Sequence, residues 1–194
     1  MRKPGSVPVY FRCDNRVMFE TEKARPARLL WAAGVAVCAG LLGWAYYLQH
    51  IQGIEPCPLC LVQRLFYYAF AATFFVAALH RPARVGAAVY GVLAALFAAG
   101  GLATASRQVW LQHLPEGQVP QCGPDLFFML ENLPLAQTLK KLVAGSGECA
   151  KIDWTFLGFS TAQWSLLCFA ALALYALVLA FYGPKLSEKL LPAA

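Results

Sequence analysis

The chain has 194 residues, of which 59% are hydrophobic and only 13% carry a charge. This composition is too apolar for an ordinary soluble domain, and it indicates a membrane protein. The net charge of +6 does not indicate nucleic-acid binding, because seven of the sixteen lysines and arginines lie in the first 28 residues, where they are typical of a segment that orients a membrane protein.

Residues 1–28 form a basic arm that contains Pro4, Pro8 and Pro26 and has no clear apolar period. We expect this arm to be poorly ordered and to lie in the cytoplasm. Met18 is an alternative to Met1 as the start of translation, and the sequence does not decide between them.

Four apolar runs follow, each with the roughly 20 residues that a helix needs to cross a bilayer. They comprise residues 29–48, 61–79, 85–105 and 164–182. Spans in lipid must satisfy their own backbone hydrogen bonds, so all four are expected to be helices. The prediction is an all-α membrane protein, a four-helix transmembrane bundle over residues 29–182, in which Arg64 is the only ionised side chain within the runs.

The loop of residues 49–60 ends in a C-x-x-C pair, Cys57 and Cys60, and Arg64 follows four residues later. If a helix begins here, the three side chains share one face. The first turn offers unpaired N–H groups and the positive end of the helix dipole, which favour a thiolate. Haem attachment would need a histidine directly after Cys60, and zinc would need further ligands nearby. Neither is present, so a redox-active dithiol is favoured, with a structural disulfide as the alternative.

The second run carries aromatic side chains that commonly serve in packing and that can also line a site for a flat, apolar ligand. They are Phe66, Tyr67, Tyr68, Phe70, Phe74 and Phe75. The short basic turn of residues 80–84 predicts that the second and third runs are antiparallel neighbours. Small residues in the third run, such as Gly91, allow close helix packing in lipid.

Beyond the third run, His113 belongs to a polar cluster at about the expected depth of the dithiol. It is a candidate for carrying protons near a bound cofactor, and an ordinary interfacial histidine is an equally good interpretation. The loop of residues 106–163 also holds Cys122 and Cys149, both in turn-rich settings. Between them, an apolar stripe at helical spacing over residues 135–143 predicts a short amphipathic helix on the membrane surface.

The distribution of basic residues predicts the topology. The arm, the turn of residues 80–84 and the tail of residues 183–194 are basic, whereas the loop of residues 49–60 has no lysine or arginine. By the positive-inside rule both termini are cytoplasmic and the loops of residues 49–60 and 106–163 face outward. Four of the seven cysteines then lie on or beside the outward loops, on the side that permits disulfides.

With these motifs the chain resembles the disulfide bond formation protein B (DsbB) family. The resemblance covers residues 29–182 and is most specific at Cys57-Pro58-Leu59-Cys60-Leu61-Val62-Gln63-Arg64, which is similar to the family's C-x-x-C-x-x-x-R signature. Residues 146–150 and the following Trp154, Gly158 and Trp164 also look like the family's second outer loop.

The resemblance implies an enzyme of the bacterial inner membrane that reoxidises a DsbA-like periplasmic thiol oxidase and passes the electrons to a membrane quinone, either ubiquinone or menaquinone. It implies the disulfides Cys57–Cys60 and Cys122–Cys149. The partner would attack Cys122, Cys57 and Cys60 would accept the electrons, and Arg64 would stabilise the Cys60 thiolate and the quinone oxygen. The alternative is a non-enzymatic four-helix membrane protein with two structural disulfides in its outer loops.

Overall fold

The computed structural model describes residues 15–80, 82, 84–115, 118 and 126–190. Within these residues the elements follow the order α1 (Asn15–His50), α2 (Pro58–His80), α3 (Arg84–Gln112), α4 (Leu126–Asn132), α5 (Leu135–Ala144), α6 (Gly147–Ala150), β1 (Thr155–Phe156), β2 (Phe159–Ser160) and α7 (Thr161–Leu190). The expected all-α membrane fold is confirmed, because α1, α2, α3 and α7 each contain a segment long and apolar enough to cross a membrane.

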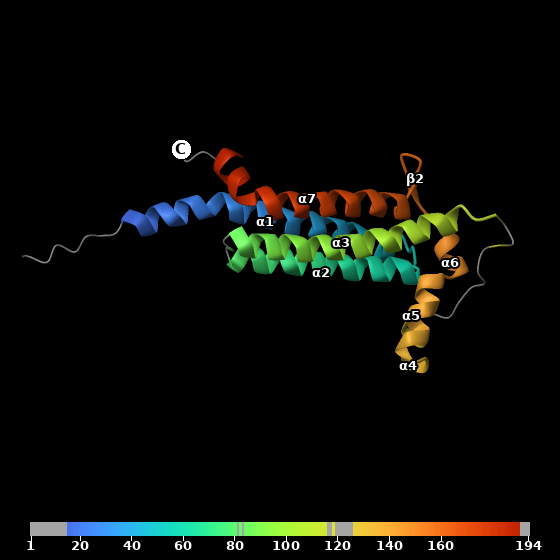
Figure 1. Ribbon diagram of the computed structural model, residues 1–194. Coiled ribbons are helices and arrows are strands. Elements are labelled where there is room, and N and C mark those ends of the chain that lie inside the picture. Colours follow the sequence, from blue (N-terminus) through green and yellow to red (C-terminus); the bar gives the residue numbers. More distant parts are fainter. Residues whose placement is uncertain (1–14, 81, 83, 116–117, 119–125, 191–194) are drawn as a thin grey trace, which may run out of the picture.

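The four long helices lie side by side in one bundle, with α3 packed against both α2 and α7, and α1 packed against α2 and α7 (Figure 1). The start of α1 and the end of α7 are at one end of the bundle. The start of α2 lies at the opposite end, which we call the dithiol end because Cys57 and Cys60 are there. The short elements between α3 and α7 also gather at the dithiol end.

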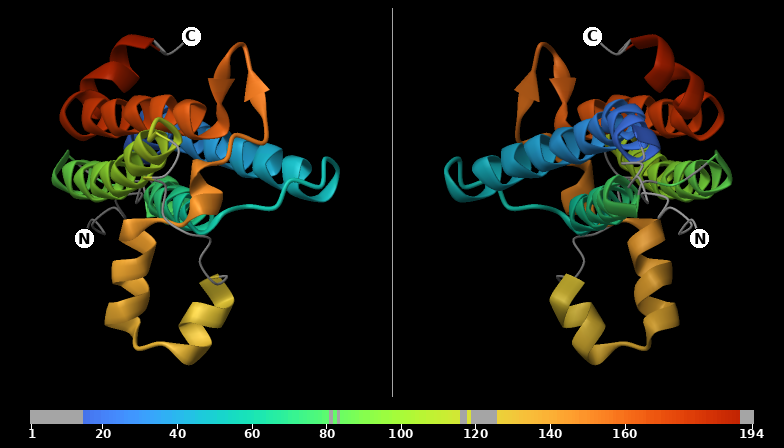
Figure 2. Two further views of the ribbon diagram at one scale, coloured as in Figure 1. Left: turned by 90° about the vertical axis from the view of Figure 1, so that its right-hand side faces the viewer. Right: turned by 90° about the vertical axis from the view of Figure 1, so that its left-hand side faces the viewer.

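Helices α4 and α5 extend sideways from the dithiol end, roughly across the direction of the bundle (Figure 2). Helix α5 begins after Pro134, as the apolar stripe predicted. Thr138 of α5 is buried and its hydroxyl donates a hydrogen bond to the carbonyl of Met129 at 3.1 Å, which joins α5 to α4. This arrangement is the one that an amphipathic helix on a membrane surface requires.

A short hairpin before α7 was not anticipated. Strands β1 and β2 are antiparallel, with Thr155 opposite Ser160 and Phe156 opposite Phe159. The two connecting residues, Leu157 and Gly158, have φ values of 53° and 82°. A two-residue turn with positive φ at both positions matches the twist of paired strands. Such turns usually carry the sequence Asn-Gly or Asp-Gly. The pair here is Leu157-Gly158, so the sequence gives no common signal for a hairpin.

The basic arm also differs from its prediction. Residues 15–28, expected to be poorly ordered, are helical and continue directly into the first span as part of α1. Once the apolar span has formed a helix, each further residue adds a hydrogen bond without a new nucleation cost, so the helix extends into polar sequence. Residues 1–14, with Cys13, lie outside the described part of the chain.

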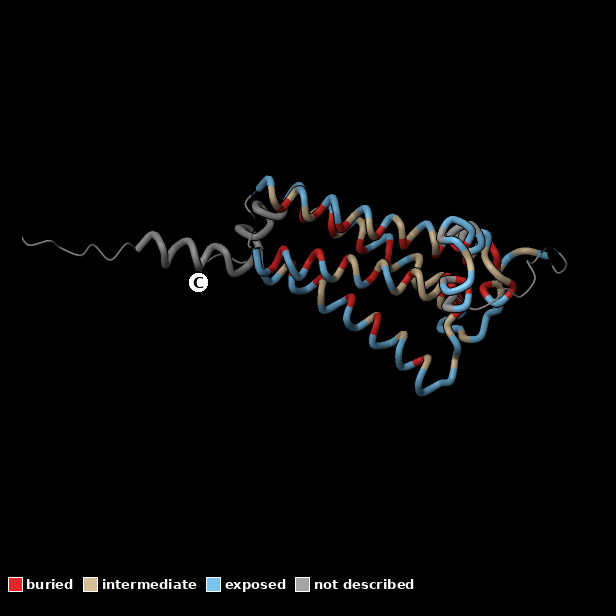
Figure 3. The backbone as a smooth tube through the Cα atoms, turned by 90° about the horizontal axis from the view of Figure 1, so that it is seen from below, coloured by how far each residue is buried: buried red, intermediate tan, exposed pale blue. Residues whose placement is uncertain are grey.

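The core of the bundle is formed by one stripe on each long helix. In Figure 3 the buried residues recur along the inner sides of the helices, and exposed residues cover the outer sides. Trp31, Tyr67, Phe70, Phe74 and Phe169 are the aromatic side chains of this core, and buried alanines of α2, α3 and α7 complete it. Apolar outer surfaces are expected of helices that face lipid.

Gly91 of α3 lies at a close contact with the backbone of α7. A Cβ atom at this position would be 2.6 Å from the Cβ of Ala180 and 2.8 Å from the carbonyl oxygen of Ala176. Gly91→Ala is therefore expected to force the helices apart and to lower the free energy of unfolding by about 1–3 kcal/mol, measured by denaturation in detergent micelles. Gly40→Ala on α1 is the control, because its Cβ would meet nothing within 4 Å; equal stability of the two variants would contradict the packing described.

Candidate active site

The two cysteines of the C-x-x-C motif lie at the start of α2 with their sulfur atoms facing each other. The backbone N–H of Leu61 donates to the carbonyl of Cys57 at 3.1 Å, so Cys57 immediately precedes the first turn and Cys60 lies within it. Their Sγ atoms are 2.8 Å apart, and the N–H of Cys60 donates to Sγ of Cys57 at 3.4 Å. Pro58 fits the first helical position, where its missing N–H loses no hydrogen bond.

A buried glutamine of α3 contacts both sulfur atoms. Nε2 of Gln108 donates to Sγ of Cys57 at 3.4 Å and to Sγ of Cys60 at 3.3 Å. Oε1 of Gln108 accepts a hydrogen bond from Nε2 of Gln63 at 2.7 Å. The two glutamines are only 3% and 5% exposed. Because hydrogen bonds to an ionised group are stronger than those to a neutral one, the Gln108 amide is placed to stabilise a thiolate on either cysteine.

Arg64 reaches from α2 to α1. Its Nη1 donates to Oε1 of Gln49 at 2.5 Å and its Nη2 donates to the carbonyl of Ala45 at 3.0 Å. Its Cζ lies 4.9 Å from the centre of the Tyr46 ring, within the range of a cation–π interaction. These contacts orient a cation that would otherwise be costly inside a membrane span. A guanidinium has five N–H donors, so donors remain for a ligand.

A pocket of about 440 Å³ opens beside the dithiol, between α1, α2, α7 and the segment that precedes α7. Cys57, Cys60 and Arg64 all line it. Its apolar walls include the side chains of Leu41, Trp44, Leu48, Trp154, Phe156 and Trp164. The volume lies within the roughly 300–1,000 Å³ typical of small-molecule sites, and aromatic walls with a few polar groups are typical of them too.

Cys149 of α6 lies directly against the dithiol. It is fully buried in an apolar cluster with Cys57, Leu59 and Leu111, and Cys60 packs against the same cluster. Its Sγ is also 3.6 Å from the hydroxyl of Ser146. The fold thus brings together cysteines that are about 90 positions apart in the sequence, and the first outer loop meets the second at this point.

The contact between Cys57 and Cys149 shifts the pKa values of the two thiols in opposite directions. A hydrogen bond from the Cys57 thiol, assisted by the backbone N–H groups near Ser146 and Leu59, lowers the pKa of Cys149 to about 6 despite its burial. The same contact, together with the one to Cys60, raises the pKa of Cys57. With both residues reduced, Cys149 carries the negative charge and Cys57 keeps its proton.

An ordinary thiol has a pKa of about 8.5 and is mostly protonated at neutral pH. In the reduced protein, by contrast, Cys149 is expected to remain a thiolate at neutral pH. The thiolate absorbance in the ultraviolet should fall only as the pH decreases through about 6. Cys149→Ser should remove this transition, and Cys57→Ala should move it to higher pH because the donor is lost. A transition unaffected by Cys57→Ala would show that the hydrogen bond is not its cause.

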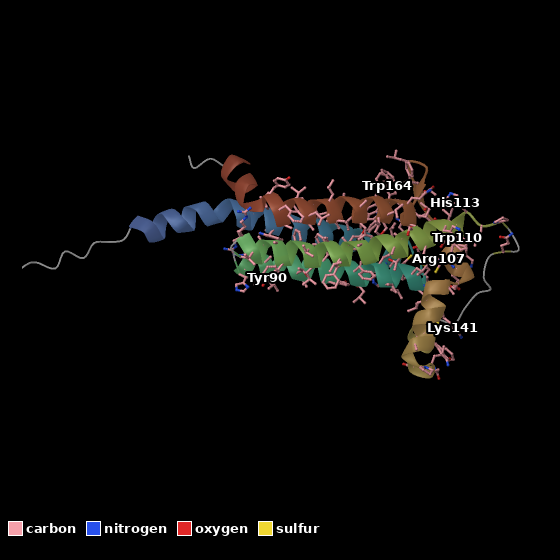
Figure 4. All side chains as sticks on the ribbon, viewed as in Figure 1. Tyr90, Arg107, Trp110, His113, Lys141 and Trp164 are labelled. Carbon is pink, nitrogen blue, oxygen red and sulfur yellow. The ribbon has the colours of Figure 1, made fainter. Side chains whose placement is uncertain are left out.

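Cys122 and His113 are the two further candidate residues that the sequence offered. Cys122 lies outside the described residues. His113 is exposed in the turn that follows α3, where Nδ1 is 2.8 Å from the carbonyl oxygen of Val109. Figure 4 shows His113 with Trp110 and Arg107 at the end of α3, and it is not among the residues that line the pocket.

Three glutamines support the dithiol and Arg64, namely Gln108, Gln63 and Gln49. The sequence placed Gln108 in the polar cluster at the depth of the dithiol without giving it a role, and the roles of Gln63 and Gln49 were missed. Glutamines in or beside membrane spans must find hydrogen-bond partners, and this was the available signal. Of the six aromatic residues noted in the second run, only Tyr67 lines the pocket. Phe70 and Phe74 are instead completely buried in the bundle core.

Comparison with known proteins identifies the family of the chain. The family model described as "Disulfide bond formation protein DsbB" matches residues 27–179. Proteins named "Disulfide bond formation protein B" from Methylococcus capsulatus and Aromatoleum aromaticum are each 47% identical over 152 residues, which is 78% of this chain and 93% and 91% of theirs. The Azoarcus protein of that name is 49% identical over 157 residues, 81% of this chain and 94% of its own. No solved structure gives a significant match.

The match extends over the first three spans, the fourth span as far as residue 179, the C-x-x-C segment and the α6 segment that holds Cys149. It thus includes every described element that contributes to the pocket. The chain therefore belongs to the disulfide bond formation protein B (DsbB) family, as a multi-pass inner-membrane thiol oxidoreductase of disulfide bond formation.

Proposed function

We propose that the protein reoxidises a DsbA-like periplasmic dithiol oxidase and passes the electrons to a membrane quinone. One observation carries this proposal. Cys149 from the second outer loop touches the Cys57–Cys60 pair from the first, and that pair lines a largely aromatic pocket that also contains Arg64. Such an arrangement can receive electrons from a protein on one side and deliver them to a flat, apolar acceptor on the other.

In the resting protein we place disulfides between Cys57 and Cys60 and between Cys122 and Cys149. A thiolate of the reduced partner attacks Cys122, and Cys149 leaves as a thiolate. Backbone N–H groups near Ser146 and Leu59 lower the pKa of Cys149 and do not depend on the redox state of Cys57, and a thiol with a lower pKa leaves faster in this exchange. Partner and protein are then joined by a mixed disulfide at Cys122.

The released Cys149 thiolate is in contact with Cys57, so it attacks Cys57 and displaces Cys60. A Cys57–Cys149 disulfide forms, and Cys60 leaves as a thiolate that accepts the N–H of Gln108. The partner's second thiolate then attacks its own mixed disulfide and frees Cys122. That thiolate attacks Cys149, which restores Cys122–Cys149 and leaves Cys57 and Cys60 reduced. Two electrons have moved from the partner's dithiol to the pocket.

The pocket residues fit a quinone. The aromatic walls match a flat ring, and Arg64 has unused donors beside Cys60 for a carbonyl oxygen. A bound quinone supplies the two-electron acceptor that regenerates the Cys57–Cys60 disulfide. The chain's own contribution is to hold the ring beside Cys60, to stabilise negative charge with Arg64 and Gln108, and to exclude water with the tryptophans.

For the topology, we place the dithiol end at the periplasmic face and both termini in the cytoplasm. The start of α1 and the start of α3 lie at the opposite end of the bundle, and the sequence around both is basic, as the positive-inside rule requires of a cytoplasmic end. The partner, which is periplasmic, then meets the loop that carries Cys122 and Cys149.

The test is reduction of a short-chain ubiquinone by the purified full-length protein when a reduced DsbA-like oxidase is added. Wild-type protein should reduce quinone continuously, in proportion to the dithiol supplied, while Cys60→Ser should not. Cys38→Ala is the control, because Cys38 is buried in the bundle core and does not line the pocket. Wild-type protein that reduces no quinone and keeps both disulfides intact would favour a structural role for those bridges.

A further inference from the structure

A pair of hydroxyl groups faces the pocket one helical turn beyond Arg64. The hydroxyl oxygens of Tyr67 on α2 and Ser165 on α7 are 3.2 Å apart, and both residues line the pocket. The Tyr67 ring is fixed by stacking on Phe169, with ring centres 4.1 Å apart, and Tyr67 is only 7% exposed. The position of the hydroxyl pair is therefore set by packing.

The hydrogen bonds of this pair leave one donor unused. Two hydroxyls carry two hydrogens, and their mutual bond uses one. Among the described residues neither hydroxyl has another hydrogen-bond partner. Hydroxyls in helices usually bond to the carbonyl of the preceding turn, as those of Thr73 and Thr104 do. Ser165 instead points across to Tyr67, so the pair presents a free O–H within a largely apolar pocket.

The spacing between this donor and Arg64 suits a ligand with two acceptors. Arg64 and Tyr67 are three residues apart on α2, which places them on one face with a rise of about 4.5 Å along the axis. Both line the same pocket, Arg64 in the turn that follows Cys60 and Tyr67 one turn further into the bundle. A para-quinone carries its two carbonyl oxygens on opposite sides of one ring, and each needs a donor when it leaves water.

We propose that the Tyr67–Ser165 hydroxyl pair donates a hydrogen bond to one carbonyl oxygen of a para-quinone, while Arg64 donates to the other. This inference rests on the function proposed above and adds the second of two contacts that fix the ring. With both oxygens held, the ring cannot rotate in its plane, and its position relative to Cys60 is defined. Tyr67 and Ser165 are then positioning residues for quinone.

The test compares a double variant, Tyr67→Phe with Ser165→Ala, against wild-type protein and Tyr175→Phe. The double variant removes both hydroxyls and keeps the stacked ring. Tyr175→Phe is a matched control, because its hydroxyl donates to the carbonyl of Leu30 at 2.7 Å and Tyr175 does not line the pocket. The probe is a short-chain ubiquinone, isotopically labelled at one or the other carbonyl carbon, added to the full-length oxidised protein.

Two readouts do not depend on turnover. The Kd for the probe, from quenching of tryptophan fluorescence, should rise about 3- to 10-fold in the double variant, the loss expected for one neutral hydrogen bond. In infrared spectra of bound probe, one labelled carbonyl band should shift to higher frequency, while the other band keeps its wild-type position. Tyr175→Phe should change neither the Kd nor the bands.

An unchanged Kd with both carbonyl bands at their wild-type frequencies would overturn the inference. If wild-type protein still reduces quinone in that case, the proposed function stands and only the assignment of the hydroxyl pair fails. If wild-type protein neither binds nor reduces the probe, the proposed function fails and the inference fails with it.

Discussion

Cys57→Ser is expected to leave one round of partner oxidation and to abolish every later one. In the proposed relay, the Cys122–Cys149 disulfide of this variant can still oxidise a single equivalent of reduced partner. The Cys149 thiolate then has no disulfide to attack, because the atom that it contacts in the wild type, Sγ of Cys57, is replaced by oxygen. Steady-state quinone reduction should fall to the background rate.

The measurement is the stoichiometry of partner oxidation after acid quenching and alkylation of free thiols. Cys149→Ser should behave differently from Cys57→Ser, because it cannot form the proposed second-loop disulfide and should oxidise no partner even in the first round. Cys38→Ala, in the bundle core, is again the control and should turn over at the wild-type rate. Continuous turnover by Cys57→Ser would contradict the relay through the contact between Cys57 and Cys149.

Arg64→Met is expected to raise the KM for quinone about 10- to 100-fold, the loss of one charge-assisted hydrogen bond of roughly 1.5–3 kcal/mol. Met preserves the apolar length of the side chain and removes the donors. The KM for the partner oxidase should not change, because in the proposed relay the partner reacts at Cys122. Arg64→Lys keeps the charge but cannot contact Gln49 and Ala45 together as the guanidinium does, so an intermediate KM is expected.

Initial rates at varied quinone and fixed partner concentration measure this effect. Arg107→Met is the matched control, because Arg107 lies near the same end of the bundle, with its Cζ 4.1 Å from the centre of the Trp110 ring. Arg107 does not line the pocket, so its replacement should leave the KM for quinone unchanged. Similar KM values for the two arginine variants would remove Arg64 from the quinone site.

The parts of the molecule that depend on local sequence were predictable. The four spans follow from the length of the apolar runs, and the start of α5 follows from Pro134 and the apolar stripe after it. The first turn of α2 at the C-x-x-C pair is similarly local, because Pro58 suits the first helical position. In each case the secondary structure of a segment depends on that segment alone, on its helix-start residues and on whether its side chains prefer lipid or water.

Predictions failed where a neighbouring element decides the conformation. Residues 15–28 have no apolar period, yet they are helical because they continue a helix that has already formed. The hairpin before α7 has a Leu-Gly turn that carries no common signal. The hairpin has one side chain, Phe156, in the wall of the pocket.

By itself the sequence determined that this is a four-span membrane protein with a C-x-x-C pair at the start of the second span and an arginine one turn away. Only the tertiary structure decided that Gln108 contacts both sulfur atoms, that Cys149 lies against Cys57, and that Tyr67 and Ser165 share one face of the pocket. The reason is physical: apolar length and helix starts are properties of one segment. Contacts between α2, α3, α6 and α7 depend instead on how the bundle packs, which no single segment specifies.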